Sequence, residues 1–143
     1  MIFFFDTSAL IKRYVLEIGS NKVDELFEIA ENIIVSSVTK IEAHSTLKRL
    51  LAANLISEAD YETVKSNLDY DFKYFTVVSL NEEIEKESIR QIEKHQLKTL
   101  DSIQLASVLY RKIDISGFIV SDVKLKNAAE VEDIQVIDPT LFE

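Results

Sequence analysis

The chain has 143 residues, of which 47% are hydrophobic, and it carries a formal net charge of −9 and no cysteine. This length suits one domain with one proper core, and we expect a single domain over residues 1–143. Without cysteine there is no disulfide or thiolate metal site, which fits a reducing, cytoplasmic setting. No stretch approaches the roughly 20 apolar residues of a membrane helix, so no membrane partner is expected. The negative charge argues against nucleic-acid binding unless several acids converge on a cation.

The N-terminal stretch joins a strand pattern to a helix pattern through a carboxylate. Residues 2–5 are all apolar and predict a strand that is buried on both faces. Asp6 follows, and Thr7 or Ser8 can then cap a helix over residues 9–14. In open α/β sheets, ligands bind just outside the carboxyl ends of the strands. A role for Asp6 as a helix cap and a functional role are both open at this point.

The rest of the chain alternates between strand and helix patterns. Short apolar runs predict strands at residues 33–35, 76–78, 118–120 and 134–137. Helical spacing and capping residues predict helices at residues 20–31, about 37–53, 57–74, 81–95, 100–112 and 124–129. In the helix over residues 100–112, we expect the inward side chains to be Leu100, Ile103, Ala106, Leu109 and Tyr110. This alternation predicts an α/β fold with three layers, in which helices cover both faces of a parallel, about five-stranded sheet.

Four acidic residues occupy positions that a parallel sheet would bring together. Asp6 and Asp122 follow predicted strands, while Glu42 and Asp101 lie near the starts of predicted helices. At one sheet edge these carboxylates would repel one another strongly without cations. Hard, oxygen-liking ions such as Mg²⁺ or Mn²⁺ suit such a cluster. Two such ions can activate a water and stabilise the leaving oxygen in phosphodiester hydrolysis.

Four short motifs occur in an order and at intervals that resemble PIN-domain proteins, and among them the VapC-type toxin ribonucleases. The resemblance covers nearly the whole chain, and its ending at residues 134–139 is also similar. The motifs are Asp6-Thr7-Ser8-Ala9-Leu10, Ser36-Ser37-Val38-Thr39-Lys40-Ile41-Glu42, Leu100-Asp101-Ser102-Ile103-Gln104-Leu105-Ala106 and Ile119-Val120-Ser121-Asp122-Val123-Lys124-Leu125.

The resemblance implies a PIN-like fold and a Mg²⁺- or Mn²⁺-dependent endoribonuclease with an RNA substrate. It also implies a homodimer and a cognate antitoxin protein as partners. Thr7 or Ser8 would support the first acid. The catalytic metal ligands, direct or through water, would be Asp6, Glu42, Asp101 and Asp122.

The chain departs from the family pattern in two places. It lacks the glycine that members often carry before the last strand, and residues 123–126 contain no further acid that would act as a fifth ligand. Basic residues near the motifs could contact RNA phosphates, although each could equally be ordinary solvated surface. These residues are Lys12, Arg13, Lys40, Arg49, Lys98, Lys124 and Lys126.

Two other functions stay open on the sequence alone. One is a housekeeping RNA-processing nuclease with the same site, and the other is a non-catalytic acidic protein-binding module whose acids only cap helices. A phosphate-receiver domain would have paired acids after its first strand, and an aspartate-nucleophile phosphatase would have an Asp-x-Asp motif. Asp6 is followed instead by Thr7 and Ser8, so we discount both.

Overall fold

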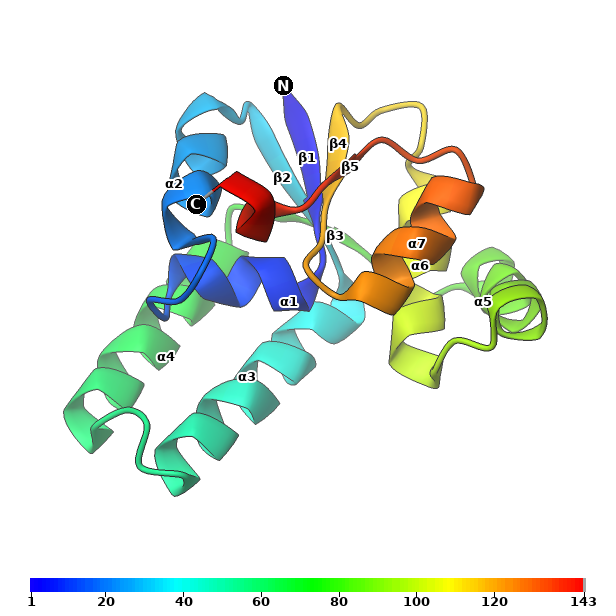
Figure 1. Ribbon diagram of the computed structural model, residues 1–143. Coiled ribbons are helices and arrows are strands. Elements are labelled where there is room, and N and C mark those ends of the chain that lie inside the picture. Colours follow the sequence, from blue (N-terminus) through cyan, green and yellow to red (C-terminus); the bar gives the residue numbers. More distant parts are fainter. Residues whose placement is uncertain (143) are drawn as a thin grey trace.

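The computed structural model describes residues 1–142 and contains a parallel sheet of five strands between two layers of helices (Figure 1). The strands lie side by side in the order β3-β2-β1-β4-β5, and every pairing is parallel. The predicted three-layer α/β/α architecture is therefore confirmed. The strands are β1 (Ile2–Phe5), β2 (Asn32–Ser36), β3 (Thr76–Val78), β4 (Gly117–Ile119) and β5 (Val136–Ile137).

Four helices cover one face of the sheet and three cover the other. The first face carries α1 (Thr7–Leu10), α2 (Ser20–Ile29), α3 (Ser37–Ala52) and α4 (Glu58–Phe72); the second carries α5 (Glu82–His95), α6 (Thr99–Tyr110) and α7 (Val123–Val131). Two 3-10 turns follow α1 and β5, at Ile11–Arg13 and Pro139–Phe142. Helices α3 and α4 run side by side and project away from the sheet (Figure 1). Among residues 1–142, no helix has the length and apolar character needed to cross a membrane.

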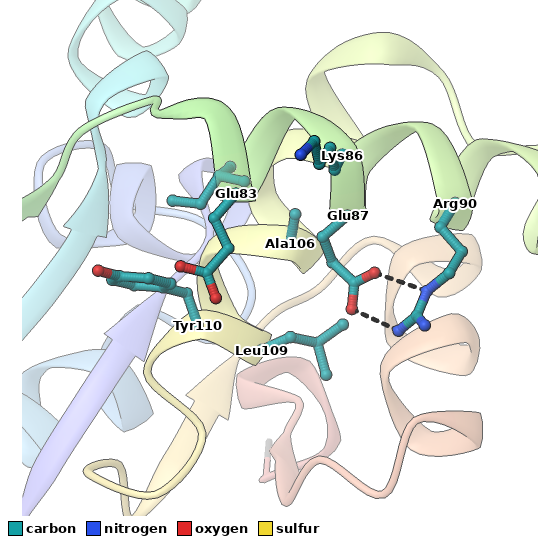
Figure 2. A pocket seen from close by; sticks show the side chains of 8 residues that line it. Glu83, Lys86, Glu87, Arg90, Ala106, Leu109 and Tyr110 are labelled. Carbon is teal, nitrogen blue, oxygen red and sulfur yellow. Dashed lines mark hydrogen bonds and ion pairs between the residues drawn. The ribbon is translucent and has the colours of Figure 1, made fainter.

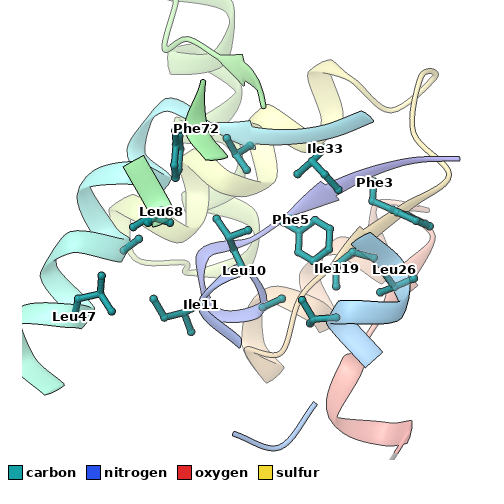
Figure 3. Packing of buried hydrophobic residues seen from close by; sticks show 14 residues of the cluster. Phe3, Phe5, Leu10, Ile11, Leu26, Ile33, Leu47, Leu68, Phe72 and Ile119 are labelled. Carbon is teal, nitrogen blue, oxygen red and sulfur yellow. The ribbon is translucent and has the colours of Figure 1, made fainter. Parts of the chain in front are cut away.

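Strand β1 is the centre of the hydrophobic core because its side chains enter both helix layers. Phe3 and Phe5 pack into the cluster under α1–α4 (Figure 3), and Phe4 packs into the cluster under α5–α7. All three rings are fully buried. The Phe4 ring meets Phe118 of β4 edge to face, with the ring centroids 5.8 Å apart. The two-sided burial predicted for this strand is therefore present.

The strand order creates a switch point beside β1. The chain runs from β1 outward through β2 to β3, and then returns to place β4 on the other side of β1. The backbone N–H of Asp6 still donates to the Ile119 carbonyl at 2.9 Å, so pairing of β1 with β4 continues to the sheet edge. Ligands of open parallel sheets bind at such a switch point.

The inward face of α6 differs from the prediction. Leu100 and Tyr110 are 45% and 49% exposed, whereas the polar Gln104 is fully buried. Leu100 lies at the first turn and Tyr110 at the last, and each lines a hollow beside the helix instead of packing on the sheet. The apolar spacing therefore indicated the wrong face at both ends of this helix.

The last strand is shorter than the predicted range of residues 134–137. The backbone N–H of Ile134 donates to the Ala129 carbonyl at 3.0 Å and so completes the end of α7. Ladder pairing starts instead at Gln135, whose carbonyl accepts from the Phe118 N–H at 2.8 Å. The Ile134 N–H is therefore used by the end of α7 and does not pair with a neighbouring strand.

We expect Phe4→Ala to lower the free energy of unfolding by about 3–5 kcal/mol, because it leaves a cavity between β1 and α6. Urea unfolding followed by circular dichroism measures this change. Ile113→Ala is the control, since Ile113 is 99% exposed and its truncation should change stability by no more than about 0.5 kcal/mol. Equal effects of the two substitutions would contradict the central role of β1.

Candidate functional site

One cleft at the carboxyl ends of the strands contains all four predicted acids. It has a volume of about 710 Å³. Asp6 comes from the end of β1, Glu42 from α3, Asp101 from the first turn of α6 and Asp122 from the start of α7. The structure therefore brings together the four side chains that the sequence predicted. The other lining residues are Thr7, Ser8, Ile11, Lys12, Glu17, Val38, Ile41, Ser45, Thr46, Arg49, Leu100 and Ser121.

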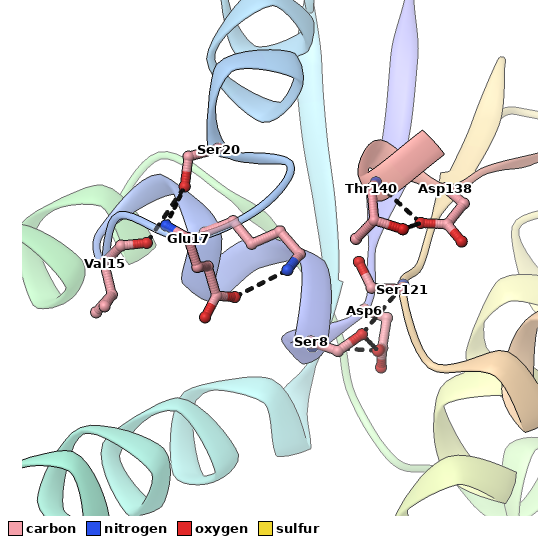
Figure 4. Close-up of polar contacts among 9 residues, drawn as sticks. Asp6, Ser8, Val15, Glu17, Ser20, Ser121, Asp138 and Thr140 are labelled. Carbon is pink, nitrogen blue, oxygen red and sulfur yellow. Dashed lines mark hydrogen bonds and ion pairs between the residues drawn. The ribbon is translucent and has the colours of Figure 1, made fainter. Parts of the chain in front are cut away.

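Asp6 caps helix α1 and also anchors the cleft. Its Oδ2 atom accepts hydrogen bonds from the Ser8 N–H at 3.1 Å and from the Ser8 hydroxyl at 2.5 Å (Figure 4). The same Ser8 hydroxyl accepts from the Ser121 N–H at 3.3 Å, so it connects the ends of β1 and β4. Within residues 1–142, the Oδ1 atom of Asp6 has no hydrogen-bond donor. That oxygen is available to a ligand.

The environment of Asp6 disfavours its charge. Its side chain is 4% exposed, and burial raises its pKa from 3.8 to about 7. The hydrogen bonds from Ser8 oppose this shift, whereas the charges of Glu42 and Asp101 increase it. Three of the four acids are therefore close enough to repel one another across the cleft.

Asp101 and Asp122 form the other side of the acidic group. Burial raises the pKa of the half-buried Asp101, and the charges of Asp122 and Glu42 raise it further. Lys98 and Lys124 partly offset this increase. Asp122 is exposed and caps α7, with Oδ1 accepting from the Leu125 N–H at 2.8 Å. Each capping aspartate thus uses one carboxylate oxygen for its helix.

Glu42 accepts hydrogen bonds from two buried polar side chains, of which the sequence singled out only Thr7, and singled it out as a support for Asp6. Its Oε1 atom accepts from the Thr7 hydroxyl at 3.0 Å and from Gln104 Nε2 at 2.9 Å. Gln104 Nε2 also donates to the Thr39 hydroxyl at 2.8 Å. The structure thus places Ser8 against Asp6 but Thr7 against Glu42. Spacing could have indicated both missed residues, because Thr39 precedes Glu42 by one helical turn and Gln104 follows Asp101 by one turn.

Only two of the seven candidate basic residues line the cleft, Lys12 and Arg49. Lys12 is 8% exposed, and its Nζ atom lies 2.9 Å from Oε1 of Glu17, which also lines the cleft. Three of the other five have partners elsewhere: Arg13 pairs with Asp24, Lys124 donates to the Gln96 carbonyl and Lys126 pairs with Asp138. A continuous basic rim, as the sequence allowed, does not form from these residues.

The donor chemistry of the cleft fits a hard divalent cation. All four acids supply oxygen, and a positive ion would relieve the repulsion that the buried Asp6 and the half-buried Asp101 experience from the neighbouring acids. In the arrangement of residues 1–142, no three acidic or histidine side chains converge closely enough to hold a metal. Binding would therefore bring at least some of the acids that line the cleft closer to one another.

A second hollow lies between α5 and α6 and contains none of the four acids (Figure 2). It has a volume of about 340 Å³ and includes an ion pair between Glu87 and Arg90, with Oε2 and Nε 2.7 Å apart. This pairing neutralises two of the four charged side chains that line the hollow. The lining residues are Glu83, Ile84, Lys86, Glu87, Arg90, Ala106, Leu109 and Tyr110.

Residues 3–131 match the family model of the PIN domain. The chain belongs to the PIN domain family. This membership confirms the resemblance found in the sequence, and the matched residues include the whole cleft. No curated protein has a significant sequence match to the chain.

Solved structures share the fold of this PIN domain at low sequence identity. FitAcB from Neisseria gonorrhoeae matches with a TM-score of 0.72 and 16% identity, covering 97% of this chain and 98% of that one. A toxin–antitoxin complex from Klebsiella pneumoniae matches with a TM-score of 0.68 and 18% identity, covering 95% and 96%. VapC20 from Mycobacterium tuberculosis, described as a toxin that cleaves the sarcin–ricin loop, matches with a TM-score of 0.67 and 14% identity, covering 88% and 94%.

Asp6→Asn should stabilise the metal-free PIN domain at about pH 8 but not at about pH 4. The Asp6 carboxyl group loses its proton near pH 3.8 in the unfolded chain, whereas burial raises its pKa to about 7 in the folded protein. Wild-type stability should therefore fall as pH rises between these values, by on the order of 2–4 kcal/mol. Asparagine keeps an acceptor for Ser8 and does not titrate. Urea unfolding in EDTA at both pH values measures the difference, and a difference that is the same at both would contradict the burial of Asp6.

Proposed function

We propose that the protein is a metal-dependent endoribonuclease and the toxin of a type II toxin–antitoxin pair. The observation that carries this proposal is the convergence of Asp6, Glu42, Asp101 and Asp122 in one cleft at the switch point of the sheet. Four acids from four separate elements can surround a cation. Membership of the PIN domain family supports a nuclease.

In this proposal the four acids hold Mg²⁺ or Mn²⁺ directly or through water. A bound ion would supply an activated water and stabilise the leaving oxygen in phosphodiester hydrolysis. Asp6 and Asp122 present the oxygen that their capping bonds leave free. Arg49 contributes positive charge that orients RNA phosphates in the cleft, whereas the charge of Lys12 is paired with Glu17.

The proposed partners follow from the structural neighbours. Two of them are described as a toxin–antitoxin complex and as VapBC-1 from nontypeable Haemophilus influenzae. We propose a cognate antitoxin for this chain, together with a homodimer and a cytoplasmic location. The high negative charge of the chain favours a basic antitoxin segment that enters the acidic cleft, where an arginine could pair with the carboxylates.

The binding-module alternative accounts for only half of the acids. Asp6 and Asp122 do cap helices, as this alternative requires. The cap of α3 is Ser36 and the residue at the cap position of α6 is Lys98, so Glu42 and Asp101 are not explained by capping. A housekeeping RNA-processing nuclease would use the same site. Growth arrest upon expression, relieved by co-expression of a neighbouring small gene, would distinguish the toxin from it.

We expect the purified protein to cleave at least one member of a panel of transfer, ribosomal and messenger RNA in Mg²⁺ or Mn²⁺, and none in EDTA. Asp6→Asn and Asp101→Asn should each lower the cleavage rate by at least about 100-fold, because each removes a charge that holds the ion. Gel analysis of the cleaved RNA, with mapping of the 5′ ends, measures the rate and the product.

Glu83→Gln is the matched control, because Glu83 is an exposed acid that lines the other hollow (Figure 2). Its cleavage rate should equal that of the wild type. Equal cleavage by the wild type and both aspartate variants would indicate a contaminating nuclease, and it would contradict the assignment of the cleavage to these acids.

Mg²⁺ or Mn²⁺ at about 100 times its Kd should add about 2.7 kcal/mol to the free energy of unfolding, since only the folded state binds it well. The melting temperature should then rise by roughly 5–10 °C in calorimetry. Asp101→Asn should remove most of this shift, and Glu83→Gln should keep it. An unchanged melting temperature of the wild type at millimolar metal would count against the proposed site.

A further inference from the structure

We propose that Gln104 is a positioning residue that holds Glu42 in the orientation needed to bind the metal ion. This inference rests on the proposed function of the cleft and assigns a role to a side chain outside it. Gln104 is fully buried in α6 and does not line the cleft. Gln104 can therefore affect the site only through the polar side chains that it contacts, which are Thr7, Thr39 and Glu42.

A buried polar cluster, made of Thr7, Thr39 and Gln104, lies beneath the acidic cleft. Thr39 and Gln104 are fully buried and Thr7 is 6% exposed. The Nε2 atom of Gln104 lies 2.8 Å from the Thr39 hydroxyl, 2.9 Å from Glu42 Oε1 and 3.2 Å from the Thr7 hydroxyl. The buried polar cluster therefore joins α1, α3 and α6, and each of these elements adjoins or contains one of the site acids.

Counting protons settles the orientation of the Gln104 amide. The ionised carboxylate of Glu42 can only accept, so the atom of Gln104 that faces it must be the nitrogen, which has two protons. The two shortest contacts use these protons, one on Thr39 and one on Glu42. The single proton of the Thr7 hydroxyl then completes the second bond to Glu42 Oε1, at 3.0 Å.

The consequence for Glu42 is that one oxygen is restrained and the other is free. Oε1 accepts two hydrogen bonds from the buried polar cluster, and Oε2 accepts none from residues 1–142. A glutamate on an exposed part of a helix samples several rotamers, whereas two donors on one oxygen select a single one. Partners behind a metal ligand orient it in this way and change metal affinity or activity by roughly 10–100-fold when removed.

Packing alone does not account for a glutamine at this position. The Oε1 atom of Gln104 is buried and has no hydrogen-bond partner, which costs stability that an apolar side chain would not lose. Gln91 of α5 has the same features outside the cleft: it is fully buried, its Oε1 lacks a partner, and its Nε2 donates to Glu132 Oε1 at 3.1 Å. Gln91 is thus a matched control for the loss of a buried glutamine.

The test compares Gln104→Met with Gln91→Met in the full-length protein. Methionine keeps the length of the side chain and removes the donors. Titration of Mn²⁺ alone, followed by calorimetry, should show roughly tenfold weaker binding for Gln104→Met and unchanged binding for Gln91→Met. With RNA as substrate, kcat should fall roughly tenfold for Gln104→Met while KM stays within about twofold.

A purely structural role predicts a different result. Both variants would then change stability in urea unfolding, and neither would change Mn²⁺ affinity or kcat, which would overturn the proposal. Thr39→Val is a milder variant, because it retains the shape of the side chain and removes one acceptor of Gln104. It should weaken Mn²⁺ binding in the same direction by a smaller factor, so the test does not depend on Gln104→Met folding.

A crystal structure of metal-free Gln104→Met separates this inference from the proposed function. We expect the Glu42 carboxylate to leave its wild-type position or to occupy several rotamers. A Glu42 carboxylate that keeps its place would overturn the positioning role even if the enzyme is active. A wild type that binds no Mn²⁺ and cleaves no RNA would overturn the proposed function, while displacement of Glu42 in the variant would still support the contact described here.

Discussion

Burial of a carboxylate at the end of the central strand is the constraint on which the rest of the cleft depends. The three phenylalanines of β1 pack into both helix layers. Asp6 follows them directly and is therefore largely shielded from water. An ionised Asp6 at that place requires compensation. The double hydrogen bond from Ser8 supplies part of it, and a cation held among the acids would supply the remainder.

The parallel topology explains why groups from several elements lie around the Asp6 carboxylate. Every strand points its carboxyl end toward the same edge of the sheet, so the elements that follow β1, β2 and β4 all begin beside Asp6. Helix α6 reaches that edge through its packing on β2 and α3. The buried polar cluster beneath the cleft then sets the relative positions of α1, α3 and α6. The acids are thus placed by backbone elements that the whole core holds rigid.

Much of this architecture could be predicted, because apolar runs and capping residues are local signals. The strands, the helices and the four acids all follow from such signals. The order of the strands does not, since pairing of β1 with β4 depends on packing between distant segments. The role of Gln104 could not be predicted from capping or apolar spacing, because its burial depends on contacts with Thr7 of α1 and with Thr39 and Glu42 of α3. The sequence left Lys12 open between a phosphate contact and solvated surface, whereas tertiary packing buries it and pairs it with Glu17.

The pairing of β1 with β4 also has a consequence for synthesis of the chain. Phe3 is paired with Gly117, so β1 receives this neighbour only after the 113 residues between them have been made. Such distant pairing slows folding because the intervening loop must be closed first. Until residues 117–122 emerge, a nascent chain has one open edge on β1 and lacks the wall of the cleft that carries Asp122. A chain in which β4 has not yet been made therefore has no assembled cleft.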